Sequence, residues 1–160
     1  GKTVRRAERR GVTYEWTATF RDQIERRALF HRALAIDDKS WTGLERSGLR
    51  EGGMESFYEA MTRYLAPRGT LRMVFARLDG EDVAMGFGGI LGTAFRGLQM
   101  SYDARYPDLG LGNLIQWQLI SKLIEEGVES YDLGTDMDYK LRWAEAELET
   151  IPLVIRSIRA

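Results

Sequence analysis

Residues 98–115 read LQMSYDARYPDLGLGNLI, and the pattern that they begin extends into the residues that follow. The first six residues alternate between apolar and polar, as in a strand with one buried face. A proline and two glycines, Gly110 and Gly112, then interrupt the alternation, because neither residue type continues a strand cheaply. After the glycines the apolar residues recur with helical spacing. The segment therefore predicts a strand over 98–103, a glycine loop, and a long helix over 111–126.

Apolar spacing assigns an inward face to this long helix and to a second helix expected over 56–65. On each helix the apolar residues recur every three or four positions, which places them on one side. The inward residues expected on the long helix are Leu111, Leu114, Ile115, Trp117, Leu119, Ile120, Leu123 and Ile124. Those expected on the second helix are Phe57, Met61, Tyr64 and Leu65.

The glycine loop before the long helix has two interpretations. A glycine turn at a helix N-terminus presents unpaired N–H groups and the positive end of the helix dipole, with no β-carbon to hold an anion away. Such a turn can cradle a phosphate group. Alternatively, Gly110 and Gly112 only let the chain turn into a buried helix, since short glycine loops match many sequences by chance.

Composition excludes several classes of protein. The chain has 160 residues, of which 44% are apolar and 29% charged, and a net charge of −1, as expected of one soluble domain. This charge favours neither a nucleic acid nor an anionic membrane as partner, and no apolar run approaches the roughly 20 residues that span a bilayer. The lack of cysteine excludes disulfides, a thiol nucleophile and cysteine-ligated metals. We expect one cytoplasmic domain over 1–160, with 1–11 as the tail of an upstream segment.

The other elements follow from the same signals. The arginine-rich start of the chain is either a basic arm for nucleic acid or a solvated helix end. Further strands are expected over 12–16, 71–78, 83–91, 130–134 and 151–158, further helices over 20–37 and 137–144, a loop over 38–43 and a turn over 92–97. Three antiparallel strands followed by a strand–helix–strand step make a mixed α/β sheet with helices on both faces.

This order of elements and four short motifs resemble the GNAT N-acyltransferase superfamily. The resemblance is closest to its BioF2-like (CelD-type) acetyltransferase branch, which is related to the FemAB aminoacyl transferases, and it runs to about Trp143. The motifs are DKSW at 38–41, SYD at 101–103, the glycine turn at 111–114, and DLG at 132–134 leading to YKLRW at 139–143. The resemblance implies the GNAT fold, a twisted and mostly antiparallel sheet with one strand–helix–strand step.

The resemblance also implies acetyl-CoA or a related acyl-CoA as the donor. In GNAT folds two neighbouring strands splay apart, here 98–103 and 130–134, and the pantetheine arm hydrogen-bonds between them like an added strand. The pyrophosphate would sit on the main-chain amides of 109–113. The general GNAT loop has Arg or Gln three residues before its first glycine, where this chain has Pro107. The implied cofactor-binding residues are Met100, Ser101, Tyr102, Leu109, Gly110, Leu111, Gly112 and Asn113.

Acyl transfer to an amine requires a base for the ammonium group, donors for the oxyanion and an acid for the departing thiolate. Asp103 or Asp132 is the predicted base, although each could instead be a turn residue. Tyr102 and Tyr139 are candidate acids, unless their rings only fill the core. The resemblance points to Lys140 as a group that stabilises an oxyanion or a phosphate, and the alternative is a solvated helix lysine.

Two residues are assigned to the acceptor, and none to a metal. Lys39 and Trp41 lie in a loop that GNAT proteins use over the acceptor pocket, although Trp41 could equally plug the core. His31 is the only histidine and is expected inside a helix, so it cannot by itself build a catalytic triad or a multi-histidine metal site.

Three functions are consistent with this sequence. The first is an N-acyltransferase that moves an acetyl group from acyl-CoA, by direct attack, to an amine on a sugar, an amino acid or an envelope precursor, including one for cellulose or another polysaccharide. The second is a FemAB-like transferase that uses aminoacyl-tRNA, which suits the basic start of the chain but not the near-neutral net charge. The third is a non-catalytic half of a protein with a second GNAT-like domain upstream.

Overall fold

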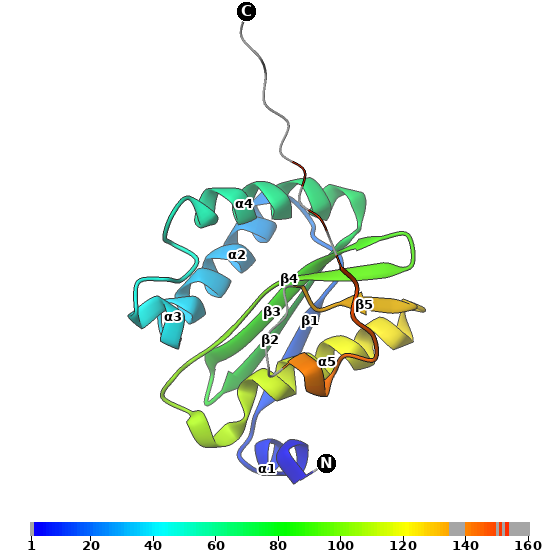
Figure 1. The fold of residues 1–160 in the computed structure, drawn as a ribbon. Helices are drawn as coiled ribbons and strands as arrows, with labels where there is room; N and C mark the ends of the chain where they lie inside the picture. The colour runs from blue at the N-terminus through cyan, green and yellow to red at the C-terminus, as the bar shows by residue number, and fades with distance from the viewer. Residues whose placement is uncertain (1, 135–139, 150, 152, 154–160) are drawn as a thin grey trace, which may run out of the picture.

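The computed structural model describes residues 2–134, 140–149, 151 and 153 (Figure 1). Its centre is a five-stranded sheet with the strands in sequence order. The strands are β1 (Thr13–Thr17), β2 (Leu71–Leu78), β3 (Glu81–Leu91), β4 (Ala94–Tyr102) and β5 (Ser130–Asp132). The first four pair antiparallel, and β5 pairs parallel to β4. The parallel pair needs a crossover, which α5 (Leu111–Glu125) supplies. The predicted mixed α/β sheet, mostly antiparallel with one strand–helix–strand step, is therefore confirmed.

Helices cover both faces of this sheet (Figure 1). On one face α2 (Gln23–Asp37) and α4 (Met54–Leu65) pack, and on the other α5 and α1 (Lys2–Arg9). The shorter helices are α3 (Trp41–Leu44), η1 (Ala66–Arg68), η2 (Pro107–Leu109) and η3 (Lys140–Arg142). Alternate residues of β2 enter the two apolar clusters, since Met73 and Phe75 face α2 while Val74 and Ala76 face α5. Both faces of the central strands are therefore buried.

Helix caps explain two differences from the prediction in the first half of the chain. The helix predicted over 20–37 begins at Gln23, because Asp22 Oδ1 accepts a hydrogen bond from the Glu25 N–H at 2.8 Å. The predicted loop over 38–43 contains the short helix α3 instead. Its first turn is capped by Ser40, whose Oγ accepts from the Gly43 N–H at 3.1 Å.

The fourth strand is longer than predicted and contains a β-bulge. β4 begins at Ala94, so the predicted turn over 92–97 is confined to its first two residues. Gly97 was read as part of the turn but lies within the strand. Gly97 is paired with Gly88 and Gln99 with Phe87, which leaves Leu98 as the extra residue. Beyond the bulge, each side chain of β4 therefore lies on the face of the sheet opposite to the one that simple alternation predicts.

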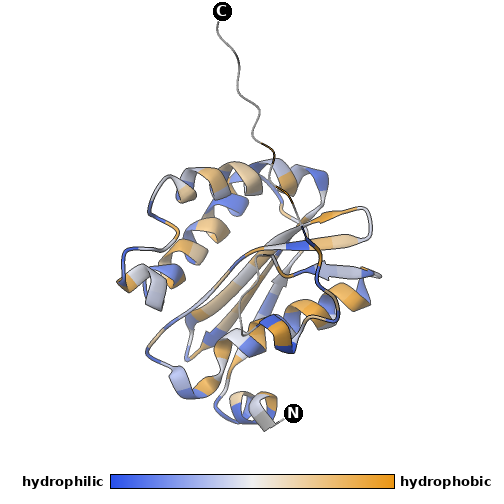
Figure 2. Cartoon of the chain, viewed as in Figure 1, coloured by the Kyte–Doolittle hydropathy of each residue, from blue (hydrophilic) through white to orange (hydrophobic). Residues whose placement is uncertain are grey.

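The inward faces of α4 and α5 are turned by about one residue from the prediction. On α5 the line through Leu111, Ile115, Leu119 and Leu123 is buried as expected. Trp117 and Ile124, however, are 49% and 67% exposed, and Gln116 is buried beside that line instead. Figure 2 shows hydrophobic and hydrophilic residues alternating along α5. On α4 the predicted Phe57 and Tyr64 are 52% and 57% exposed, whereas Thr62 is buried. In both helices a polar residue, Gln116 or Thr62, therefore lies on the inward face beside the apolar residues.

The C-terminal predictions are described only in part. Of the helix predicted over 137–144, the structure describes the residues from Lys140, where η3 lies. The strand predicted over 151–158 falls mostly outside the described residues. None of the helices in the described ranges is long and apolar enough to cross a membrane.

Candidate active site

The two parallel strands run side by side for only three residues. The pairs are Ala94–Ser130, Phe95–Tyr131 and Arg96–Asp132, after which β5 ends while β4 continues. We call the region just beyond these pairs the fork, which comprises residues 97–100 and 133–134. It lies where the sequence predicts the splay between 98–103 and 130–134.

The main chain of β4 is open along the fork. The Met100 N–H donates to the side chain of its own neighbour, Gln99 Oε1, at 3.3 Å. A bond between adjacent residues is easily exchanged for a bond to a ligand, because it fixes no other part of the structure. The predicted cofactor residue Met100 therefore lies where an extended chain can add to the strand edge.

A cavity of about 250 Å³ opens at the fork. Its walls include Tyr58 from α4 and Gln116 from α5, which cover opposite faces of the sheet. Between them the cavity is lined by residues of the fork, by Tyr131 of β5 and by Lys140 of η3. Because helices from both faces contribute, two molecules that approach from opposite sides of the sheet can meet in this cavity.

Arg96 and Asp132, the last pair before the fork, form an ion pair between β4 and β5. The second Asp132 oxygen accepts from the Gly134 N–H at 2.8 Å. Burial acts to raise the pKa of Asp132, but the hydrogen bonds from Arg96 and Gly134, together with the charges of Arg96 and Lys140, outweigh it and hold this pKa below its usual value. The predicted base Asp132 is thus at the fork, as an anion that accepts protons weakly.

Lys140 adds a second cation at the fork. A Cβ on Gly134 would stand 3.4 Å from the Arg96 guanidinium and 3.6 Å from Lys140 Nζ. Gly134 has a φ of +84°, so glycine both permits the turn and lets the chain pass close to both cations. The charges of Arg96 and Lys140 together exceed the single negative charge of Asp132, and this positive charge can stabilise an oxyanion or a departing thiolate. Tyr139 lies outside the described residues, and its predicted role stays a prediction.

Tyr58 is the residue of α4 that lines the cavity, and we call it the α4 wall. Its hydroxyl donates to the carbonyl of the bulge residue Leu98 at 3.2 Å, and its ring packs edge-on against Phe87 with the centroids 5.8 Å apart. Burial raises the pKa of Tyr58, and the charge of Arg96 opposes this only in part. The hydroxyl is therefore a neutral hydrogen-bond donor fixed at the bulge.

On the α5 side, the cavity is lined by Gln116 of α5 and by Tyr131 of β5, which we together call the α5 wall. The Tyr131 hydroxyl donates to Gln116 Oε1 at 3.4 Å, and the Tyr131 ring packs edge-on against Phe95 at 4.9 Å. Gln116 is only 5% exposed. Its Nε2 is buried and has no hydrogen-bond partner among the residues that the structure describes.

The glycine loop lies at the start of α5, on the same face as Gln116. Gly110 has a φ of +63° and stands at the N-cap without a side-chain cap, so no side chain competes for the first amides of the helix. A Cβ on Gly112 would meet the Tyr102 ring at 3.1 Å. Of the other predicted cofactor residues, Leu109 and Leu111 are buried and Asn113 is exposed. Gly112 thus permits close packing on Tyr102. The Leu109 N–H donates to the Tyr106 carbonyl at 3.3 Å, so of the predicted amides those of 110–113 are the ones left open to an anion.

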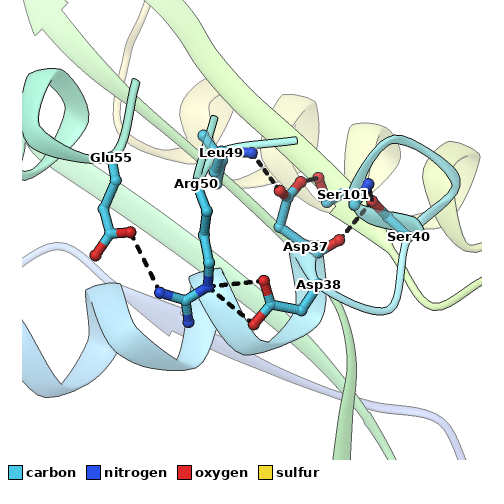
Figure 3. A network of polar contacts seen from close by, with 8 residues as sticks. Asp37, Asp38, Ser40, Leu49, Arg50, Glu55 and Ser101 are labelled. Atoms are coloured by element: carbon cyan, nitrogen blue, oxygen red, sulfur yellow. Dashed lines mark hydrogen bonds and ion pairs between the residues drawn. The ribbon is translucent and has the colours of Figure 1, made fainter. Parts of the chain in front are cut away.

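Ser101 directly follows Met100 in β4, but its side chain lies on the α2 face of the sheet and does not line the cavity. Its Oγ donates to Asp37 Oδ1 at 2.5 Å, and Asp37 Oδ2 accepts from the Leu49 N–H at 2.5 Å (Figure 3). Asp37 and Ser101 are 2% and 6% exposed. This network ties the end of α2 and the segment before α4 to β4, and its polar groups are occupied by one another.

Asp103 is also separated from the fork. It is fully buried, and its two oxygens accept from Arg105 Nε at 3.1 and 3.0 Å and from the Arg105 N–H at 2.9 Å. Burial acts to raise the pKa of Asp103, but the hydrogen bonds and the charge of Arg105 outweigh it and hold this pKa below its usual value. Neither Asp103 nor Asp132 is among the residues that line the cavity, but Asp132 pairs with Arg96, which is. The structure brings the predicted catalytic residues Asp132 and Lys140 together and leaves Asp103 apart, in a role that fixes the loop after β4.

The two predicted acceptor residues also lie away from the cavity. Trp41 is 63% exposed on α3, so it does not plug the core. Lys39 is exposed, and its carbonyl accepts from the Ala104 N–H at 3.0 Å, beside the buried end of β4. His31 lies within α2, as expected, and is exposed.

Sequence analysis did not place Tyr58, Arg96 or Gln116 near the site, although all three line the cavity. Tyr131 lies in the strand 130–134 expected at the splay but was given no role of its own. Tyr58 and Gln116 adjoin Phe57 and Trp117, which the apolar spacing placed inward. Arg96 fell within the predicted turn. One signal in the sequence could have found Tyr58 and Gln116. Each has a polar group at the end of its side chain and adjoins the apolar residues of a helix that was predicted to pack on the sheet.

One family model matches most of this chain. A family model described as "Acetyltransferase (GNAT) domain" matches residues 1–141. Among curated protein sequences, no significant match is found.

Similar solved structures share the fold at low identity. An aminoglycoside acetyltransferase from an uncultured soil metagenomic sample, in complex with sisomicin, is 12% identical with a TM-score of 0.61, over 94% of this chain and 99% of the other. A ribosomal-protein-alanine N-acetyltransferase from Brucella melitensis biovar Abortus 2308 is 16% identical with a TM-score of 0.55, over 91% and 98%. The structure of AAC(6')-Iy with a CoA-containing bisubstrate analogue is 9% identical with a TM-score of 0.56, over 93% and 99%.

Proposed function

The chain belongs to the GNAT acetyltransferase domain family, and from this premise we propose that it transfers the acetyl group of acetyl-CoA to a primary amine at the fork. One observation carries the proposal. The cavity is walled by Tyr58 from one face of the sheet and by Gln116 from the other. A donor that enters along α5 and an acceptor that enters along α4 would meet between β4 and β5.

The donor would lie along the α5 face. The amides of 110–113, at the uncapped N-terminus of α5, would bind its pyrophosphate. Its extended arm would add to the open edge of β4, where the Met100 N–H exchanges its bond to Gln99 for one to the arm. Acetyl-CoA supplies a thioester carbonyl that is open to direct attack, with the CoA thiolate as leaving group.

The chemical roles fall to the groups at the fork. Arg96 and Lys140 would place positive charge beside the oxyanion and the thiolate. Asp132, kept anionic by these cations, would attract the acceptor ammonium and receive its proton through water rather than act as a strong base. Tyr58 would donate a hydrogen bond near the bulge. The role predicted for Tyr139 is retained as a proposal.

The acceptor class is the least constrained part of the proposal. An amine on a sugar, an amino acid or an envelope precursor fits an anionic residue next to the cavity, here Asp132, which pairs with the lining residue Arg96. Structural neighbours include aminoglycoside acetyltransferases from uncultured soil metagenomic samples and a ribosomal-protein-alanine N-acetyltransferase. Amino sugars and peptides with N-terminal alanine are therefore the first acceptors to screen. Membership in the BioF2-like branch would favour the sugar or envelope amines.

Titration calorimetry with acetyl-CoA and with free CoA tests the donor directly. We expect one-to-one binding of both by the folded chain, followed by release of free CoA thiol when an accepted amine is added. If folded protein binds neither ligand and releases no thiol from acetyl-CoA with any amine, the proposal is wrong.

One observation favours a second candidate, a transferase that uses aminoacyl-tRNA. The arginines of α1 and its C-terminal end, Arg5, Arg6, Arg9 and Arg10, are exposed, and none forms an ion pair within the described residues. They lie on the helix that packs beside the glycine loop, where a Cβ on Gly110 would meet Thr3 at 3.0 Å. Salt-dependent tRNA binding without CoA binding would select this candidate. Binding of neither would leave a non-catalytic half of a larger protein.

A further inference from the structure

We propose that Gln116 binds the acetyl donor itself, by donating a hydrogen bond from Nε2 to an amide carbonyl of the pantetheine arm. This inference rests on the function proposed above. It assigns a specificity-determining side chain on the α5 wall, whereas the main-chain groups of β4 recognise only an extended shape.

The burial of Gln116 is the first observation behind this proposal. A buried amide N–H group without a hydrogen-bond partner destabilises a folded protein, so such groups are rare. Gln116 is 5% exposed, and its Nε2 has no partner among the described residues. A leucine would fit the surrounding apolar positions of α5 without that cost. The polar side chain is therefore explained by something that binds it.

The orientation of the amide is the second observation. The Tyr131 hydroxyl occupies Gln116 Oε1 at 3.4 Å, and the Tyr131 ring is held edge-on against Phe95. The acceptor end of the amide is thus engaged, and the donor end is left for a ligand. Both residues line the cavity at the fork.

The donor groups on this wall match an amide-bearing chain. Gln116 Nε2 and the Met100 N–H both donate hydrogen bonds, and the Met100 bond to Gln99 is readily exchanged. Neither group carries a charge or lies at the N-terminus of a helix, so this wall favours neutral acceptors such as amide carbonyls over phosphates. The pantetheine arm of CoA is an extended chain that carries amide carbonyls, and an adenosine bisphosphate without the arm has none to offer.

Two matched leucine variants and two probes test the proposal. Gln116→Leu removes the proposed donor, and Gln118→Leu makes the same change two residues along α5, outside the cavity. The probes are CoA and adenosine 3′,5′-bisphosphate, which lacks the arm. We expect Gln116→Leu to weaken CoA binding about tenfold, as for the loss of one hydrogen bond. Its affinity for the bisphosphate, and both affinities of Gln118→Leu, should match the parent protein.

Thermal unfolding distinguishes this role from a structural one. If Gln116 serves the ligand, Gln116→Leu should unfold at the same or a higher temperature, because the variant no longer buries an unpartnered donor. A fall in the unfolding temperature with both probes weakened equally would assign Gln116 to the fold and overturn the proposal. Unchanged CoA binding would overturn it as well.

Kinetics give an independent reading. The proposed bond is made before and during reaction, so Gln116→Leu should raise KM for acetyl-CoA and leave kcat unchanged. A fall in kcat at unchanged KM would place Gln116 on the oxyanion instead and refute the inference. If the parent protein binds the bisphosphate but not CoA, or neither, the proposed function itself fails, and the inference fails with it.

Discussion

The fork and the segment that directly follows it, residues 101–103, hold their polar groups in opposite situations. In the segment after the fork, Ser101 is engaged by Asp37, and Asp103 by Arg105. At the fork, the buried Gln116 Nε2 has no hydrogen-bond partner in the described part of the chain, and the Met100 N–H donates to its neighbour Gln99. Asp103 in one region and Asp132 beside the other both have a lowered pKa, so the pKa alone does not distinguish the two regions. The difference teaches that unsatisfied groups around a cavity, rather than perturbed charges, distinguish the proposed site from its surroundings.

The largest effect should come from breaking the buried network around Asp37. Asp37→Ala removes two hydrogen bonds from a buried carboxylate and leaves the Leu49 N–H unpaired (Figure 3). We expect a loss of about 3 kcal/mol in the free energy of unfolding, measured with urea. The matched control is Asp38→Ala, since Asp38 is exposed and pairs with exposed Arg50, and it should cost less than about 1 kcal/mol. Equal losses in the two variants would contradict the comparison.

At the fork, the corresponding change should affect turnover rather than stability. Lys140→Ala removes one of the two cations beside Gly134. We expect kcat to fall about a hundredfold while CoA affinity changes less than threefold, as measured by thiol release and calorimetry. Lys122→Ala on α5 is the control, because Lys122 pairs with exposed Glu125 outside the cavity. Full activity in the Lys140 variant would contradict this role and indicate that Lys140 is an ordinary solvated helix lysine.

Asp103 and Asp132 should differ in how their substitution changes stability and turnover, and the pH dependence of stability tests this for Asp103. Because the folded-state pKa of Asp103 lies below its unfolded value of about 4, its ionisation stabilises the fold above that pH, and the contribution is lost as the pH falls toward the folded pKa. Asp103→Asn should therefore cost about 1–2 kcal/mol at pH 7, lose less stability on acidification than the parent, and keep kcat within threefold. Asp132→Asn should lower kcat more than tenfold. The reverse pattern in kcat would make Asp103 the base.

The smallest effect is expected from a single oxygen atom. Tyr58→Phe removes the hydroxyl that donates to the Leu98 carbonyl and keeps the ring against Phe87. We expect kcat to fall three- to fivefold, with stability changed by about 1 kcal/mol or less. A change in CoA affinity without one in kcat would assign Tyr58 to the donor side.

The sequence was sufficient for the parts of the fold that local patterns control. The strand over 71–78, the glycine stop before α5 and the apolar line from Leu111 to Leu123 all depend on neighbouring residues, and all were predicted correctly. The sheet class followed from the order of these elements.

The cavity could not be predicted, because its walls depend on rotation and register. Apolar spacing fixes the buried face of a helix only to within about one residue, and the error exchanged Tyr58 for Phe57 and Gln116 for Trp117. The position of a bulge depends on how β4 pairs with β3, which no local pattern encodes. Arg96 was therefore taken for a turn residue although it ends the paired part of β4.

The extra residue at Leu98 makes this part of the chain sensitive to length rather than to identity. Arg96 and Leu98 face α4, while Met100 and Tyr102 face α5, because one residue is inserted between the two alternating sets. Removing any single residue from the bulge would interchange the two sets beyond it, sending Ser101 toward α5 and Met100 toward α2. Related sequences should therefore vary freely in composition at this point, yet carry neither insertions nor deletions.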